Sequence, residues 1–275
     1  MQPFLISNRL YDMSRLLRCI FVVSSVIVSI RSFAYQRVQD SIVGKVNAYL
    51  ETEAKQFRFN GVVLISKGGK IVLHKGYGWK DHKSNKLNDT SSIFQIGSLT
   101  KQFTSAIIFK LQEERKLSIS DALTKFLPGF PNGDKITLHQ LLTHTSGLYD
   151  YTNELTPLKF ILNKTRSKNA ILSIFRNRPL EFAPGSKFRY TNSGYFLLGL
   201  VIESVTGKNY EQVVRELIFK PTGMVSSGFD LRNLKSPALT TGYGLFFKDF
   251  QSVASVMDST VLRATNGIIA SILRK

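Results

Sequence analysis

The spacing of hydrophobic residues changes along the chain and predicts a mixture of helices and strands. Val38, Ile42 and Val46 recur at helical spacing, which predicts a helix near the N-terminus. Two runs rich in β-branched residues follow, at 61–66 and 70–74, and a Gly-Gly pair separates them. This arrangement is typical of a tight β-hairpin.

After the hairpin, the pattern becomes mostly helical. An extended stretch at Ser91–Gly97 leads into an amphipathic helical pattern that runs to about Lys116. Four further helices are predicted, at Thr137–Leu142, Lys168–Asn177, Ser193–Val205 and Tyr210–Phe219. Gly207 is a natural end for the third of these. The fold is therefore predicted to be α/β (α+β), with an antiparallel sheet flanked by helices and a largely helical subdomain.

The first 34 residues have the layout of a secretory signal. Arg9, Arg15 and Arg18 precede the apolar run Cys19–Ile30, and Ser32-Phe33-Ala34 supplies small residues at the cleavage positions. We expect residues 1–34 to be a signal peptide and residues 35–275 to be one exported domain, periplasmic or secreted. The alternative is an uncleaved N-terminal segment that anchors the chain to a membrane.

Composition narrows the classes of partner and cofactor. The formal net charge is +18, and removal of four Arg and one Asp with residues 1–34 leaves 33 − 18 = +15. The basic residues are dispersed and accompany no nucleic-acid-binding motif, so a solvated basic surface is predicted, with no nucleic-acid partner. Cys19 is the only cysteine and the histidines lack metal-ligand spacing, so neither a metal site nor a cofactor is predicted. The oligomeric state is left open.

Candidate chemistry begins with Ser98-x-x-Lys101. On a helix, positions i and i+3 share a face, so the Lys101 amine can reach the Ser98 hydroxyl. A serine needs such a neighbouring base to act as a nucleophile. The tetrapeptide alone is weak evidence, because an N-cap serine followed by a solvated lysine has the same spacing.

Two later segments strengthen this hypothesis. The first ends a short helical pattern with His-Thr-Ser-Gly-Leu at 144–148, where the Ser146 hydroxyl is predicted to bond to the local backbone, not to form a catalytic pair with His144. The second places a Pro-Gly turn before Tyr190-Thr-Asn192 and an apolar helix. Tyr-Thr-Asn also occurs at 151–153, but only the second copy has the turn before it and the helix after it.

These three motifs, in this order and at this separation, resemble the serine β-lactamase and penicillin-binding-protein superfamily. The nearest branch is that of the class C β-lactamases and D,D-peptidases, and the likeness extends from about Gln36 to the C-terminus. The resemblance implies a β-lactamase/transpeptidase-like fold with Ser98 as nucleophile. It also implies that Lys101 and Tyr190 are catalytic and that Asn192 binds substrate.

The C-terminal part departs from this pattern. The segment Ala264–Ser271 resembles one that opens a helix in the family, and the chain stops four residues later. Relatives continue through a strand that supplies one oxyanion-hole amide, so we expect the C-terminal strands of the fold to be missing. Loss of that donor is expected to slow the reaction about a hundredfold or more.

The function expected from the sequence is that of a serine acyl hydrolase. It would act through a Ser98 acyl-enzyme on a β-lactam, a D-Ala-D-Ala-type peptide or an ester. Two alternatives remain open, a non-hydrolytic binder of acyl or cell-wall-peptide ligands and an inactive truncated homologue.

Overall fold

The computed structural model describes Phe21 and residues 42–154, 167–229, 236–246, 249–253 and 269–271. The chain divides into two units, Met1–Tyr77 and Gly78–Lys275. Apart from Phe21, the predicted signal segment lies outside the described residues. Within the described part of the chain, no helix combines the length and the apolar character that a bilayer span requires.

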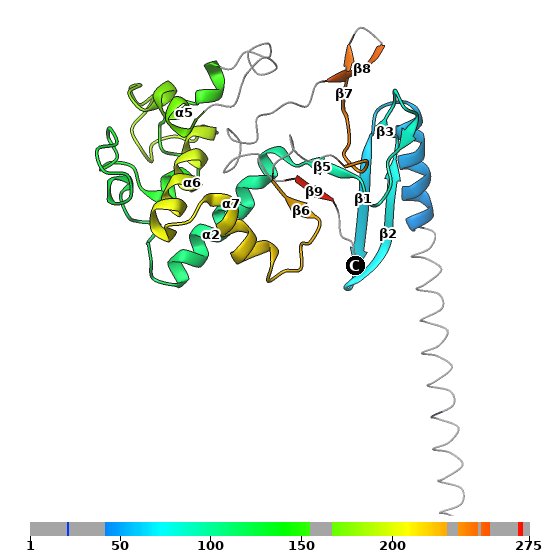
Figure 1. Cartoon of the computed structure of the whole chain (residues 1–275), viewed down its shortest axis with the longest axis horizontal. Coiled ribbons are helices and arrows are strands. Elements are labelled where there is room, and N and C mark those ends of the chain that lie inside the picture. Colours follow the sequence, from blue (N-terminus) through cyan, green and yellow to red (C-terminus); the bar gives the residue numbers. More distant parts are fainter. Residues whose placement is uncertain are drawn as a thin grey trace, which may run out of the picture. The chain divides into compact units, whose positions relative to one another are not determined.

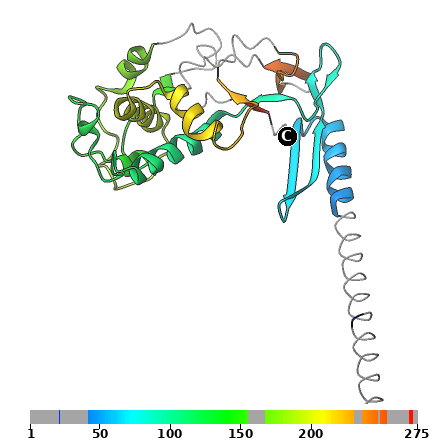
Figure 2. The same ribbon diagram turned by 60° about the horizontal axis from the view of Figure 1, so that its bottom comes forward.

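The first unit contains the predicted helix and hairpin. Its described elements are a helix at 42–55, β1 (Gly61–Lys67) and β2 (Lys70–Tyr77). The two strands pair antiparallel around Gly68 and Gly69, which both have the positive φ that a tight hairpin turn requires. The helix lies beside the hairpin (Figure 2), and Lys75 of β2 donates a hydrogen bond of 2.7 Å to Glu51 of the helix. Packing against a helix stabilises a two-stranded sheet that would be marginal alone.

The strands of the second unit are short and pair antiparallel. They are β3 (Trp79–Asp81), β4 (Lys86–Leu87), β5 (Ile93–Gln95), β6 (Ser227–Gly228), β7 (Gly242–Phe246), β8 (Asp249–Val253) and β9 (Ile269–Ser271). The pairings are β3 with β4, β7 with β8, and β5–β9–β6 as a three-stranded sheet. The antiparallel sheet prediction is therefore confirmed for the described strands.

The C-terminal segment differs from its expectation. The described part of Ala264–Ser271 is the strand β9 and not the start of a helix. The main chain of β9 pairs with β5 on one side and with β6 on the other. These two strands supply hydrogen-bond partners that a helical turn at this position would not use.

The helical subdomain is confirmed. Its elements are the 3₁₀ turn η1 (Gly97–Leu99), α2 (Thr100–Glu113), η2 (Leu123–Lys125), α3 (Leu138–Leu142), η3 (Tyr151–Glu154), α5 (Lys168–Phe175), α6 (Asn192–Thr206), α7 (Tyr210–Val214) and the π-helical turn η4 (Arg215–Phe219). Most of α6 is buried, and it contacts α2, α3 and α7, so it forms the centre of the core. Figure 1 shows β5 leading toward α2, and η1 lies between them.

Two helix ends carry local signals. The α2 helix ends at Glu113, three residues before the predicted end, because Arg115 adopts a left-handed backbone with φ 57°. The α6 helix ends at Gly207 as predicted.

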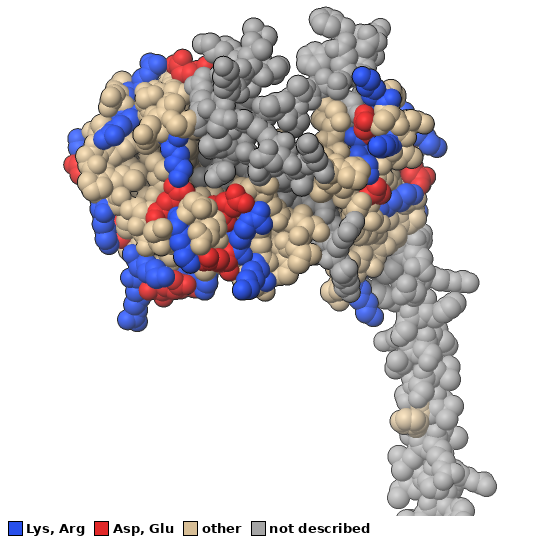
Figure 3. Space-filling model, viewed as in Figure 1, with Lys and Arg blue, Asp and Glu red and all other residues tan. Residues whose placement is uncertain are grey.

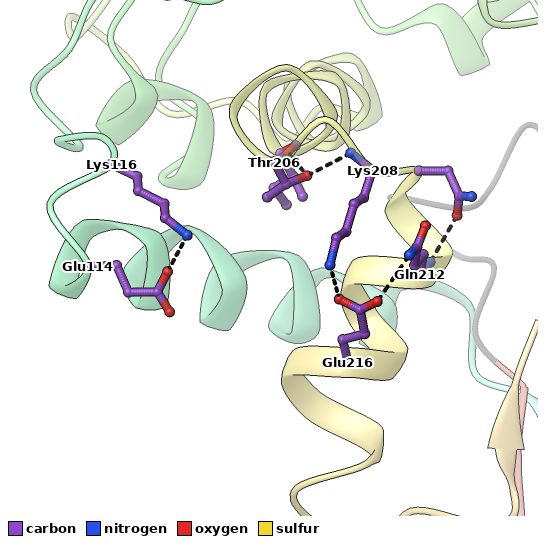
Figure 4. Close-up of polar contacts among 8 residues, drawn as sticks. Glu114, Lys116, Thr206, Lys208, Gln212 and Glu216 are labelled. Atoms are coloured by element: carbon purple, nitrogen blue, oxygen red, sulfur yellow. Dashed lines mark hydrogen bonds and ion pairs between the residues drawn. The ribbon is translucent and has the colours of Figure 1, made fainter.

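A carboxylate links the segment that follows α6. Glu216 of η4 accepts hydrogen bonds from Lys208, just before α7, and from Gln212 within α7 (Figure 4).

The surface matches the predicted dispersal of charge. On the face seen in Figure 3, basic side chains are scattered among acidic and uncharged residues, without a single basic patch. Many form ion pairs with neighbouring carboxylates, as Lys125 does with Asp121 at 2.8 Å. Such exposed pairs contribute little to stability.

Candidate active site

The nucleophile candidate lies at the junction between a strand and a helix. After β5, Gly97 takes a left-handed backbone (φ 52°), and Ser98 follows it within η1. The sequence predicted Ser98 on the first turn of an α-helix. In the structure it lies just before that turn, because one 3₁₀ turn precedes α2. Lys101 is the second residue of α2 and is only 7% exposed.

Ser98, Lys101, Tyr190 and Asn192 come together in one hydrogen-bonded group. The Tyr190 hydroxyl lies 2.7 Å from Ser98 Oγ, and Lys101 Nζ donates to Ser98 Oγ at 3.2 Å. Lys101 also donates to Asn192 Oδ1 at 2.8 Å, and its Nζ lies 4.9 Å from the centroid of the Tyr190 ring. Among the described residues, Lys101 forms no ion pair with a carboxylate. Its polar environment consists of neutral oxygens and an aromatic face.

Backbone hydrogen bonds between two loops hold Tyr190 in place. Gly185 N donates to Thr145 O, and Arg189 N donates to His144 O at 2.9 Å. Close approach of the loops requires a glycine at 147, because a Cβ there would lie 2.2 Å from the carbonyl oxygen of Phe182. The backbone of the His-Thr-Ser-Gly-Leu motif thus accepts the hydrogen bonds that position the loop carrying Tyr190.

His144 completes the surroundings of Tyr190. Its ring centroid lies 4.5 Å from that of Tyr190 and 5.0 Å from that of Tyr195. Its Nδ1 accepts a hydrogen bond of 3.2 Å from Thr191 N. Burial, helped by the Lys101 charge, lowers the pKa of His144. A neutral imidazole with its proton on Nε2 fits this environment.

The other motif residue, Ser146, plays no part in a catalytic pair with His144. It is fully buried, and its Oγ accepts a hydrogen bond of 3.4 Å from Leu148 N, as the local-turn prediction requires.

The two copies of Tyr-Thr-Asn have different surroundings. Tyr151 is fully buried and packs against Phe175 and Phe196, whereas Tyr190 is 43% exposed beside Ser98. The structure thus brings the second copy to the nucleophile. The first copy also contributes, since Asn192 Nδ2 donates to Thr152 Oγ1 at 3.3 Å.

One residue of this site was not anticipated from the sequence. Asp150 is buried, and its Oδ2 accepts hydrogen bonds from Asn192 N at 3.1 Å and from Asn192 Nδ2 at 3.2 Å. The only available signal was its position directly before the first Tyr-Thr-Asn, which looked accidental. The two hydrogens of the Asn192 side-chain amide are thus donated to Asp150 and Thr152. A substrate carbonyl would have to displace one of these two partners.

The described side chains offer little to a metal ion. In the ranges that the structure describes, no group of three or more His, Cys, Asp or Glu residues is arranged to hold one. The groups that lie within hydrogen-bonding distance of Ser98 Oγ include the Lys101 amine and the Tyr190 phenol.

Comparison with known proteins identifies the family of the chain. The family model described as Beta-lactamase matches residues 46–272. PbpX of Bacillus subtilis (strain 168) is 35% identical over 199 residues, which are 72% of this chain and 48% of PbpX. The chain therefore spans about half the length of this curated relative.

Solved structures show the same fold. The penicillin-binding protein from Bacillus halodurans is 30% identical with a TM-score of 0.68, over 81% of this chain and 68% of that one. The D-stereospecific amidohydrolase from Streptomyces sp. is 27% identical with a TM-score of 0.57, over 66% of this chain and 57% of that one. The predicted β-lactamase/transpeptidase-like fold is confirmed, whereas the class C branch stays a prediction. The chain belongs to the Beta-lactamase family of serine β-lactamases and penicillin-binding-protein-like proteins.

Proposed function

We propose that this protein is a serine acyl hydrolase in which Ser98 attacks the carbonyl carbon of an amide, lactam or ester. One observation carries the proposal. Ser98 Oγ lies within hydrogen-bonding distance of both the Lys101 amine and the Tyr190 hydroxyl. An adjacent base of this kind is what a serine needs to become nucleophilic.

The proposal assigns a direction to the proton. Lys101 donates to Ser98 Oγ, and in the reactive arrangement the serine hydroxyl donates its own hydrogen to the Tyr190 oxygen 2.7 Å away. In this proposal Tyr190 reacts as the phenolate, with the Lys101 ammonium beside it, because a neutral phenol cannot take a second proton. As the bond between Oγ and the carbonyl carbon forms, the phenolate takes the Ser98 proton, and Lys101 stabilises the negative charge that develops between them. Tyr190 then returns the proton to the leaving nitrogen or oxygen as its bond to carbon breaks.

Hydrolysis of the acyl-enzyme reverses these roles. Water gives a proton to Tyr190 and attacks the ester carbon, and the ester bond to Ser98 breaks as Oγ is reprotonated. Tyr190 is suited to both steps because the residue is partly exposed and its hydroxyl lies beside Ser98 Oγ. No cofactor takes part in this proposal.

The substrate class proposed is a β-lactam, a D-Ala-D-Ala-type peptide or an ester. Its support is the family membership and the relatives named as a penicillin-binding protein and a D-stereospecific amidohydrolase. Asn192 would assist by holding Lys101, and its predicted contact with substrate requires release of Asp150 or Thr152.

Intact-protein mass spectrometry tests the proposal. The purified chain is exposed to a fluorophosphonate and, separately, to a penicillin, with Ser98→Ala as the negative control. Ser105→Ala is the matched control, because its hydroxyl lies on α2, shortly after Ser98 in the chain, but bonds to Tyr195. One adduct that Ser98→Ala abolishes and Ser105→Ala retains is expected. Absence of any adduct on a folded sample would refute the proposal.

A second candidate function is a non-hydrolytic acyl or cell-wall-peptide binder. It is favoured by the hydrogen bonds of the Asn192 amide, whose two hydrogens are donated to Asp150 and Thr152 and so are not available to a substrate without displacement of one partner. The same experiment separates the two, because a binder keeps its acyl adduct for hours whereas a hydrolase returns to the unmodified mass. Failure of both probes would leave the inactive homologue.

Export is proposed on the residues 1–34 alone. Three arginines before the apolar run and small residues after it support a cleaved signal. Expression of the full chain and N-terminal sequencing of the product test this, because cleavage is expected after Ala34. Retention of Met1 on a membrane fraction would instead support the anchor.

A further inference from the structure

A buried carboxylate lies directly behind the asparagine that holds Lys101. Asp150 is 9% exposed, and among the described residues no cation pairs with it. Its Oδ1 accepts from Thr152 N at 2.9 Å and from Thr152 Oγ1 at 2.8 Å, while its Oδ2 accepts from the backbone and side-chain amides of Asn192. Four hydrogen bonds thus replace the water that a buried carboxylate loses.

This carboxylate determines which way the Asn192 amide points. Asn192 Nδ2 has two hydrogens, and it donates to Asp150 Oδ2 and to Thr152 Oγ1. Thr152 Oγ1 gives its own hydrogen to Asp150, so toward Asn192 it acts only as an acceptor. A rotated amide would therefore place its oxygen against two acceptors.

The orientation of the amide in turn determines the environment of Lys101. In the observed orientation, Asn192 Oδ1 faces Lys101 Nζ at 2.8 Å and accepts from it. Rotation would bring the NH₂ group against the amine, so donor would face donor and Lys101 would lose this contact. Lys101 would then be free to move away from Ser98 Oγ, which it contacts at the longer distance of 3.2 Å.

We propose that Asp150 is a positioning residue for the acylation of Ser98, which acts by fixing the Asn192 amide and, through it, the amine of Lys101. The proposal rests on the proposed function, since it concerns the rate of the same acylation. Asn192 is the residue that joins the two groups, since it accepts from Lys101 and donates to Asp150.

A double-mutant cycle on the full chain tests this dependence. Asp150→Asn keeps the shape of the side chain but replaces one acceptor oxygen with a donor NH₂ group. It is expected to slow fluorophosphonate labelling of Ser98 by about 10- to 100-fold, because small displacements of a catalytic group have effects of this size. In an Asn192→Ala background, the same change is expected to alter the rate less than about twofold. Equal slowing in both backgrounds would overturn the proposal, because a general structural defect does not depend on the Asn192 side chain.

A smaller change and a second readout keep the test informative. If Asp150→Asn does not fold, Thr152→Val removes one acceptor of the amide and is expected to slow labelling by about 2- to 5-fold, again only when Asn192 is present. The Asn192 side-chain amide can also be followed by NMR, where its signals are identified by their loss in Asn192→Ala. Its hydrogens should exchange slowly in the wild-type chain and at least about tenfold faster in Asp150→Asn.

These readouts separate the two proposals. If the wild-type chain is not labelled, the acyl hydrolase proposal fails, and the NMR measurement still decides whether Asp150 fixes the amide. Unchanged exchange in a folded Asp150→Asn would overturn the positioning role.

Discussion

Tyr190→Phe isolates one hydroxyl in the candidate site. The hydroxyl lies 2.7 Å from Ser98 Oγ, while the ring contacts with His144 and Lys101 remain available to phenylalanine. The change therefore removes a proton carrier and leaves the packing of the loop intact.

The magnitudes follow from that separation. Loss of a general acid or base slows a reaction by about 10²- to 10⁴-fold, which raises the barrier by about 3 to 5 kcal/mol. Loss of the hydrogen bond should change the free energy of unfolding by about 1 kcal/mol or less, because the ring is 43% exposed and water can replace Ser98 as partner. For a chain of this size, that corresponds to a shift in Tm of about 2 to 4 °C.

The assay is the rate of fluorophosphonate labelling of Ser98 by intact mass, with Tm measured on the same samples. Tyr149→Phe is the matched control, since it removes a hydroxyl that bonds to Glu154 at 3.0 Å, away from Ser98. We expect both variants to have similar Tm values and only Tyr190→Phe to label slowly. Labelling of Tyr190→Phe within about threefold of the wild-type rate would refute the role given to its hydroxyl.

Three further predictions concern loop packing and pH. Gly147→Ala should lower the free energy of unfolding by about 3 kcal/mol or more and slow labelling, since the new Cβ would lie 2.2 Å from Phe182 O. Chemical denaturation measures this change, and a loss below about 1 kcal/mol would contradict the prediction. Burial lowers the pKa of His144 below the unfolded value near 6.5, so its stabilising effect is complete above that pH and is lost as pH falls below it. His144→Gln should therefore flatten the dependence of unfolding free energy on pH between about 7.5 and 5.5, and an unchanged slope would count against a neutral buried imidazole. Hydrogen bonds from Lys80 and Ser91 lower the pKa of Asp89 to about 2, so its contribution is present above about pH 4 and is lost toward pH 2. Acid unfolding of Asp89→Asn should show less pH dependence in that range, and a wild-type profile would contradict the assignment.

The sequence predicted the elements whose signals are local. The Gly-Gly pair at 68–69, the helical periodicity of 193–205 and its end at Gly207 all appear in the structure near their expected positions. The contact between Lys101 and Ser98 was also expected from local spacing, because residues three apart near a helix start share a face, whereas their assignment to a site needed the two later motifs.

The features that sequence reasoning missed depend on contacts between distant segments. Asp150 reaches Asn192 across 42 residues, and nothing in its neighbouring sequence marks it as buried. His144 was assigned only to a turn, because its contact with the Tyr190 ring arises from pairing between two loops. The η1 turn was not expected either, since 3₁₀ and α-helical starts have similar residue preferences.

The position of Asn192 as the first residue of α6 has a consequence for how the protein tolerates change. Ten residues of this helix are buried, so the group that holds Lys101 is part of the same cooperative unit as the core. Local fraying is available to loops and termini, but a buried central helix opens only with the whole subdomain. Substitutions in the core should therefore reduce the amount of folded protein without altering the contact between Lys101 and Asn192 in each folded molecule.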